Sequence, residues 1–279
     1  MRKKLHTLRL IRNFYRFCLF VLAAYSQLVV ADEEKPKLWE AGIGIGGQVL
    51  NDYRGSDEYQ TEVFPLPIFL YHGKFFKADR EGVRGEVFKN NQLRLQFSAE
   101  LALNTSNENN EARQGMPELD SAFEWGPSLH INLTEDDFDS GWHLRLSTRW
   151  VTTFGENGLS QKGYLFNPNF TFIPKQLPYL SKAWQAQANL GAIYGSDSYH
   201  SYFYSVNDEQ MTALRPAYNA DSGFSGWFTK FGVSRNFNKQ WAGLSLRYDN
   251  LSGASFRGSP LVKSEHYVSL SFLYAYILF

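Results

Sequence analysis

The chain has 279 residues, 28 basic and 28 acidic residues, and a single cysteine. Its mean hydropathy is −0.37, although aromatic residues make up 16% of the chain. A helical membrane protein would have a positive mean hydropathy and apolar runs of about 20 residues, and a nucleic-acid-binding protein would be basic, so the composition excludes both classes. Many aromatic residues with a polar average are typical of a transmembrane β-barrel, in which alternate residues face lipid and water.

Residues 1–31 have the features of a cleaved signal peptide. Six basic residues and no acidic residue lie within 2–16, an apolar stretch follows at 17–30, and Ala31 is a small residue suited to the cleavage site. A short membrane anchor is the alternative, but the apolar stretch is below spanning length. We therefore expect a signal peptide at 1–31 and one barrel domain at 32–279, with a formal charge of −6 and no cysteine.

Beyond the signal, apolar and polar residues alternate with period two. In 92–103 leucine, phenylalanine and alanine side chains share one face, and polar or charged side chains share the other; the pattern recurs at 123–133, 142–150, 184–194 and 242–249. A soluble β-sandwich also alternates. However, the apolar faces begin or end with Trp or Tyr, as in the aromatic girdles of membrane barrels, and the polar faces carry charges in mid-strand, as a water-filled lumen allows.

We predict an all-β fold, a closed antiparallel transmembrane β-barrel of twelve strands, with ten as the alternative. Bacterial barrels have an even number of strands, short periplasmic turns and longer external loops. This rule places the tight turn at 90–91 in the periplasm and the polar segments 104–119, 154–162 and 196–223 outside. The predicted strands are 39–50, 62–72, 74–80, 83–89, 92–103, 120–133, 141–153, 163–173, 183–195, 224–237, 240–250 and 267–279.

The first and last predicted strands each raise a specific question. The glycines of 42–47 are not followed by a helix or a P-loop lysine, so we predict a strand whose small residues face a crowded lumen rather than a nucleotide loop.

The terminal Phe279 resembles the signal read by the barrel assembly machinery, a partner during biogenesis. We expect Leu273, Ala275 and Ile277 to face lipid with Phe279, although the opposite face of this strand is also apolar.

Four short motifs go beyond a generic barrel. They are Asn51–Asp57 after the first strand, Pro65–Pro67 in the second, Tyr202–Val206 in the longest loop, and Ser259–Val262 before the last strand. In this order and spacing they resemble the MipA/OmpV family of outer-membrane proteins. The positions that carry the resemblance are Tyr53, Gly55, Ser56, Asp57, Pro65, Pro67, Ser259 and Pro260.

The resemblance implies a location in the Gram-negative outer membrane, in contact with its lipid and lipopolysaccharide. It also implies a non-enzymatic scaffold linked to peptidoglycan synthesis and remodelling, with a lytic transglycosylase and a penicillin-binding protein as partners. It supplies no catalytic residue and no cofactor. In the loop motif, Phe203 and Ser205 depart from the family's usual sequence.

The charged side chains of the polar faces suggest a second function, a narrow channel for small solutes. A barrel of twelve strands is narrow beside porins of about 16–18 strands, which favours a lumen filled by paired charges. The residues expected to face the lumen are Arg94, Glu100, Glu124, His130, His143, Arg145, Arg149, Lys230, Arg247 and Asp249.

A third alternative is an outer-membrane hydrolase. His200 and Ser201, with Asp197 or Asp208, supply the side chains of a Ser-His-acid triad in the longest external loop. Such triads are recognised by geometry, and sequence neighbours alone do not make one, so we predict a protein without enzymatic activity. The acidic run at 135–139 lacks the spacing of an EF-hand, and we expect no metal or cofactor site.

One predicted periplasmic turn is a candidate docking surface for a protein partner. It runs from Pro174 to Leu180 and contains two prolines together with Leu177 and Tyr179. A rigid turn with no partner is the alternative.

Overall fold

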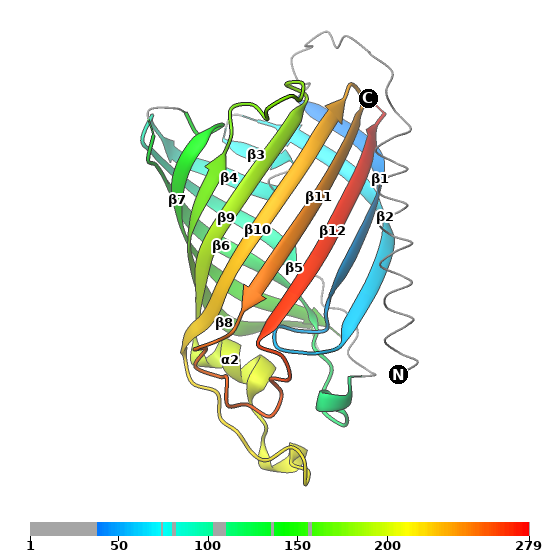
Figure 1. Ribbon diagram of the computed structural model, residues 1–279, viewed down its shortest axis with the longest axis vertical. Helices are drawn as coiled ribbons and strands as arrows, with labels where there is room; N and C mark the ends of the chain where they lie inside the picture. The colour runs from blue at the N-terminus through cyan, green and yellow to red at the C-terminus, as the bar shows by residue number, and fades with distance from the viewer. Residues whose placement is uncertain are drawn as a thin grey trace. The chain divides into compact units, whose positions relative to one another are not determined.

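The computed structural model describes residues 38–73, 75–79, 82–102, 110–134, 137–155 and 158–278. These residues form twelve antiparallel strands that close into a barrel, with β12 pairing back to β1 (Figure 1). The predicted fold class is confirmed, and the alternative of ten strands is wrong. The predicted signal peptide lies outside the described residues. In the described part of the chain, no helix is long and apolar enough to cross a bilayer.

The strands agree closely with the predicted ranges. They are β1 (Trp39–Asn51), β2 (Tyr59–His72), β3 (Phe76–Asp79), β4 (Gly82–Lys89), β5 (Leu93–Ala102), β6 (Ser121–Asn132), β7 (Gly141–Gly155), β8 (Gly158–Ile173), β9 (Trp184–Gly195), β10 (Gly223–Phe237), β11 (Gln240–Asn250) and β12 (His266–Ile277). The largest difference is at 154–162, where β7 and β8 continue as a hairpin that pairs Gly155 with Gly158. Polar residues there bond across the strands, as Thr152 Oγ1 does to Gln161 Oε1 at 3.0 Å, so their polarity marks a solvated hairpin rather than a loop.

The described part of the last strand faces the opposite way to the prediction for Leu273, Ala275 and Ile277, and Phe279 lies outside the described residues. Ala275 is buried, and Ser269 on the same face lines the lumen. Tyr274 is exposed on the outer surface, where it pairs with the exposed Ile45 of β1. The prediction failed because this strand is apolar on both faces, so alternation could not decide its direction.

The barrel wall has few hydrogen-bonded pairs between β2 and β3. Among the described residues, β3 pairs with β2 only at Tyr71 and His72. The His72 amide donates to the Leu38 carbonyl at 2.9 Å. The backbone N–H and C=O groups of even-numbered residues in β2 therefore bond to β1, and those of odd-numbered residues point toward β3. Pro65 and Pro67 are odd-numbered and their side chains are exposed on the outer surface. Their missing N–H groups therefore remove no bond to β1, consistent with the confinement of proline to weakly paired strand edges.

The connections at the two ends of the barrel differ in length. At one end, drawn at the bottom of Figure 1, lie 52–58, 110–120, 196–222 and 251–265, together with the helix α2 (Asp197–Tyr204). We call these four segments the roof. The roof also contains two short 3-10 helices, η1 (Glu111–Arg113) and η2 (Asp208–Gln210). The opposite end carries the shorter turns.

Candidate functional site: the roof and the chamber beneath it

The four segments of the roof share one apolar core. Tyr204 and Phe256 stack with ring centroids 3.6 Å apart and an angle of 5° between the rings, and both side chains are buried. Contiguous buried contacts of this kind define a core, so the segments form a packed layer rather than separate loops. The core residues are Tyr53, Leu119, Tyr204, Val206, Ala220, Leu251, Ala254, Phe256, Leu261 and, from β12, Tyr267.

Three of the four sequence motifs meet in this core. The Tyr53 hydroxyl donates to the Leu261 carbonyl at 2.7 Å, the Tyr204 hydroxyl donates to the Arg54 carbonyl at 2.9 Å, and the Ser259 hydroxyl donates to the Tyr204 carbonyl at 2.6 Å. Burial raises the pKa of the Tyr53 hydroxyl, so it stays protonated and keeps its role as donor. Motifs from the start, middle and end of the chain thus hold each other in place.

Gly55 and Ser56 are required by the local backbone. Gly55 has φ of +100°, a conformation that side chains rarely adopt, and its carbonyl accepts hydrogen bonds from two backbone amides of the loop before β12, at 2.7 and 3.0 Å. Ser56 is buried, and its Oγ accepts from Asn110 Nδ2 at 3.0 Å and from the Glu58 amide at 3.1 Å. Gly55 therefore joins the segment 52–58 to 251–265, and Ser56 joins it to 110–120.

The remaining motif positions are more peripheral. Asp57 is exposed and Pro260 is partly buried in the roof. Pro65 and Pro67 lie on the outer face of β2, away from the roof. The motif in the second strand is thus the one that the structure does not bring to this site.

The His200 side chain holds the roof together and does not form the triad considered as an alternative. It is buried in α2, its Nε2 lies 2.6 Å from Ser225 Oγ, and its Nδ1 lies 2.6 Å from the Asp221 carbonyl oxygen. Burial lowers the pKa of the imidazole. Ser201 instead donates its hydroxyl to a backbone carbonyl at 3.3 Å, and Ser225 is fully buried. His200 is therefore not paired with Ser201 as the hydrolase alternative required, and its ring nitrogens bond to neither the Asp197 nor the Asp208 carboxylate.

A cavity of about 500 Å³, which we call the chamber, lies in the lumen beneath the roof. Tyr199 and Phe203 of α2 contribute to its lining on the roof side. Eight of the ten residues predicted to face the lumen line the chamber: Glu100, Glu124, His130, Arg145, Arg149, Lys230, Arg247 and Asp249. Of the remaining two, Arg94 lies 3.6 Å from a Glu86 carboxylate oxygen, and His143 is buried.

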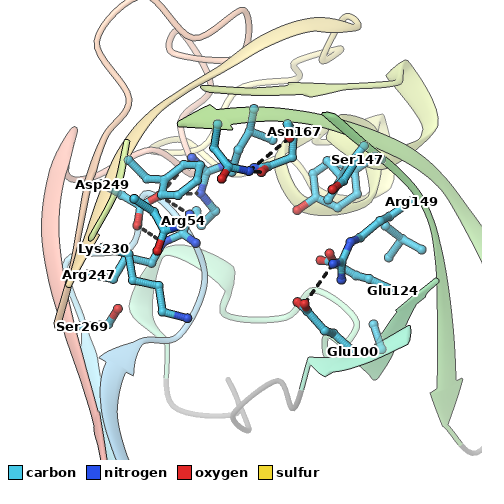
Figure 2. A pocket seen from close by; sticks show the side chains of 18 of the residues that line it. Arg54, Glu100, Glu124, Ser147, Arg149, Asn167, Lys230, Arg247, Asp249 and Ser269 are labelled. Atoms are coloured by element: carbon cyan, nitrogen blue, oxygen red, sulfur yellow. Dashed lines mark hydrogen bonds and ion pairs between the residues drawn. The ribbon is translucent and has the colours of Figure 1, made fainter. Parts of the chain in front are cut away.

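Arg54 connects the roof to the chamber wall. Its side chain points into the lumen (Figure 2) and donates to the Tyr267 hydroxyl at 3.0 Å and to the Ser225 carbonyl at 2.9 Å. Arg54 Nη2 also lies 3.2 Å from Asp249 Oδ1. Asp249 is fully buried and also accepts two hydrogen bonds from Arg247. One carboxylate therefore serves two guanidinium groups.

Sequence reasoning missed Arg54. It was not singled out because it lies in a loop, where the strand alternation that identified the other lumen charges does not apply. Its neighbours Tyr53 and Gly55 were identified through the family resemblance. The motif therefore marked the segment but not the side chain that enters the lumen.

The candidate docking turn lies at the other end of the barrel, between β8 and β9. Tyr179 has φ of +62° and its side chain is fully exposed. The Leu180 amide donates to the Leu177 carbonyl at 3.2 Å, and Leu177 is half-buried. A tight turn thus presents one aromatic side chain to its surroundings.

Among the described residues, no group of three His, Cys, Asp or Glu side chains is placed to hold a metal ion. Glu135 and Asp136 of the acidic run lie outside the described residues.

Residues 43–278 match the family model described as "MltA-interacting protein MipA". The chain belongs to the MipA family. This confirms the resemblance drawn from the motifs and, with the closed barrel, places the protein in the Gram-negative outer membrane. No curated protein matches the chain.

Several solved structures are similar to this MipA-family barrel. A bacterial polysaccharide outer membrane secretin is 10% identical, with a TM-score of 0.43, 86% of this chain covered and 98% of that one. The outer membrane protein OprG from Pseudomonas aeruginosa is 10% identical, with a TM-score of 0.24 and coverage of 86% and 95%. OpdO of the same organism is 10% identical, with a TM-score of 0.27 and coverage of 86% and 97%.

Proposed function

We propose that this MipA-family barrel is a non-enzymatic scaffold that binds a lytic transglycosylase at the periplasmic end of the barrel. Through this contact, and through a penicillin-binding protein as second partner, it links the outer membrane to peptidoglycan synthesis and remodelling. The description of the family, which names MltA as the interacting protein, supports the choice of partner.

The observation that carries the docking surface is the exposed Tyr179. Short turns of bacterial barrels face the periplasm and longer loops face outward, so we infer that the roof is external and the turn at 174–183 is periplasmic. Exposed aromatic side chains are the residues that protein interfaces most often bury at their centres. Tyr179 and the exposed Leu180 beside it lie where a periplasmic partner would bind.

Binding of a purified MltA-type transglycosylase to the full-length barrel in detergent micelles tests the proposal. We expect Tyr179→Ser to weaken binding at least tenfold and Leu177→Ser to weaken it less, because Leu177 is half-buried. The matched control is Leu214→Ser, which changes a side chain that is 90% exposed in the roof and should leave binding unchanged. Full binding by Tyr179→Ser would reject this surface, and no binding by the wild-type barrel would reject the scaffold.

A narrow solute channel is the second candidate, and the charged lining of the chamber favours it. The packed core of the roof opposes an open pore, because its four described segments pack against and bond to one another instead of standing apart as separate loops. Planar bilayers distinguish the two functions: the scaffold predicts no steady conductance, and the channel predicts conductance steps that persist in the wild-type protein.

A further inference from the structure

Four hydrogen-bond donors stand side by side on one wall of the chamber. The strand register pairs Asn189 with Lys230, Lys230 with Arg247, and Arg247 with Ser269, across β9, β10, β11 and β12. All four side chains line the chamber. We call them the donor row. Like charges directly opposite each other destabilise a sheet, so the pairing of Lys230 with Arg247 requires compensation.

The charges around the donor row do not balance. Arg54 and Arg247 share the single carboxylate of Asp249. Lys230 has no ion-pair or hydrogen-bond partner among the described residues, and Figure 2 shows its side chain extending into the open space of the chamber. Three cations and one carboxylate give this wall a local charge of +2. The unpaired Lys230 amine is therefore available to an anionic group in the chamber.

The opposite wall carries two neighbouring carboxylates. Glu100 of β5 pairs in register with Glu124 of β6, which again sets like charges side by side. Arg149 Nη2 lies 2.9 Å from Glu100 Oε1, and Arg145 of the same strand also lines the chamber. The Glu124 carboxylate lies beside this pair and forms no hydrogen bond or ion pair among the described residues. Figure 2 shows these residues across the chamber from Lys230 and Arg247.

We propose that the chamber binds a small zwitterionic solute, of the size of an amino acid or a dipeptide. Its carboxylate lies against Lys230 and Arg247, and its ammonium group lies against Glu100 and Glu124. The chamber volume of about 500 Å³ is within the usual range of ligand pockets, about 300–1,000 Å³. The cationic wall and the two carboxylates that face it set up a field across the chamber, which orients a molecule with separated charges. A simple anion or cation would meet only one of the two sets of groups.

This site is independent of the scaffold function. The donor row lies beneath the roof, and Tyr179 lies at the other end of the barrel. The proposal therefore stands or fails without reference to the binding of a transglycosylase.

Three dipeptide probes of nearly equal size separate the alternatives. They are L-alanyl-L-alanine, which is zwitterionic, its N-acetyl form, which is only anionic, and its C-terminal amide, which is only cationic. Calorimetric titration into the full-length barrel in detergent should show the zwitterion binding at least tenfold tighter than either blocked form. Equal affinity for the N-acetyl form, or no binding of any probe at millimolar concentration, would overturn the proposal.

Two variants assign the groups of the ligand. Lys230→Gln should weaken the zwitterion and the N-acetyl form at least tenfold and leave the amide unchanged, whereas Glu124→Gln should weaken the zwitterion and the amide instead. The control Lys239→Gln removes an exposed lysine from the turn after β10 and should change no affinity. Lys230→Gln removes a like-charge contact, so it should fold with an equal or higher unfolding midpoint. If either chamber variant binds all three probes like the wild type, the assignment is wrong.

Discussion

The Asp249 carboxylate is the counter-ion that joins the roof to the chamber wall. It is fully buried and holds Arg247 of its own strand and Arg54 of the roof. The substitution Asp249→Asn keeps the size of the side chain and one oxygen acceptor but removes the charge. Two guanidinium groups and the neighbouring Lys230 would then face each other without a carboxylate.

The expected loss is about 3 kcal/mol. Breaking a buried ion pair by removing one partner costs about 3–5 kcal/mol, and a hydrogen bond to a charged group contributes about 1.5–3 kcal/mol. The amide retains one acceptor, and the guanidinium of Arg247 is partly exposed to the chamber, with a side-chain exposure of 31%. Both facts place the loss at the lower end of the range.

Urea unfolding of the barrel in micelles, followed by tryptophan fluorescence, measures the change as a shift of midpoint at constant slope. The double-mutant cycle with Arg54→Met should show a coupling of about 1–3 kcal/mol. Asp57→Asn is the control, because Asp57 is exposed in the roof and such changes stay within about 0.5 kcal/mol. A loss below about 1 kcal/mol for Asp249→Asn, or no coupling to Arg54, would refute the role given to this carboxylate.

Three further predictions concern the roof. Phe256→Ala should lower the free energy of unfolding by about 3–5 kcal/mol, because it empties a fully buried site stacked on Tyr204; a loss under about 1 kcal/mol in urea unfolding would show that the roof has no packed core. Ser56→Ala leaves the Asn110 amide with one acceptor fewer, and we expect about 1–3 kcal/mol less stability by the same assay. Burial lowers the pKa of His200 in the folded state, so the unfolded chain binds a proton first as the pH falls below about 6.5; stability is full above that pH and declines below it. His200→Gln should flatten this decline between about pH 7 and pH 5, and an unchanged pH profile would contradict the assignment.

The sequence predicted the strands well because alternation is a local property. Gln92–Leu103 has its apolar and polar residues on separate faces, so both the strand and its direction could be read. Residues 273–278 are apolar on both faces, and there the strand could be predicted but its direction could not. The hairpin of β7 and β8 was mistaken for a loop because glycines and polar residues dominate 154–162 and hide the alternation.

The candidate site depends on contacts between distant segments, which local patterns do not contain. The lumen charges on strands were predicted because strand direction gives their side. Arg54 entered the lumen from a loop, and His200 paired with Ser225 rather than with its neighbour Ser201. Neither contact follows from spacing, because each is set by how α2 and the first loop pack above the strands.

The roof also determines where this barrel can accept foreign sequence. External loops are the usual places for epitope tags, because exposed tips tolerate insertions. Here an insertion beside Gly55 or Ser259 would pull apart hydrogen bonds that hold three segments together. The segment after η2, where Leu214 is almost fully exposed, leaves those bonds intact. A tag or an antibody epitope should therefore be displayed at 211–214, while the neighbouring loops behave as interior sequence despite their position at the end of the barrel.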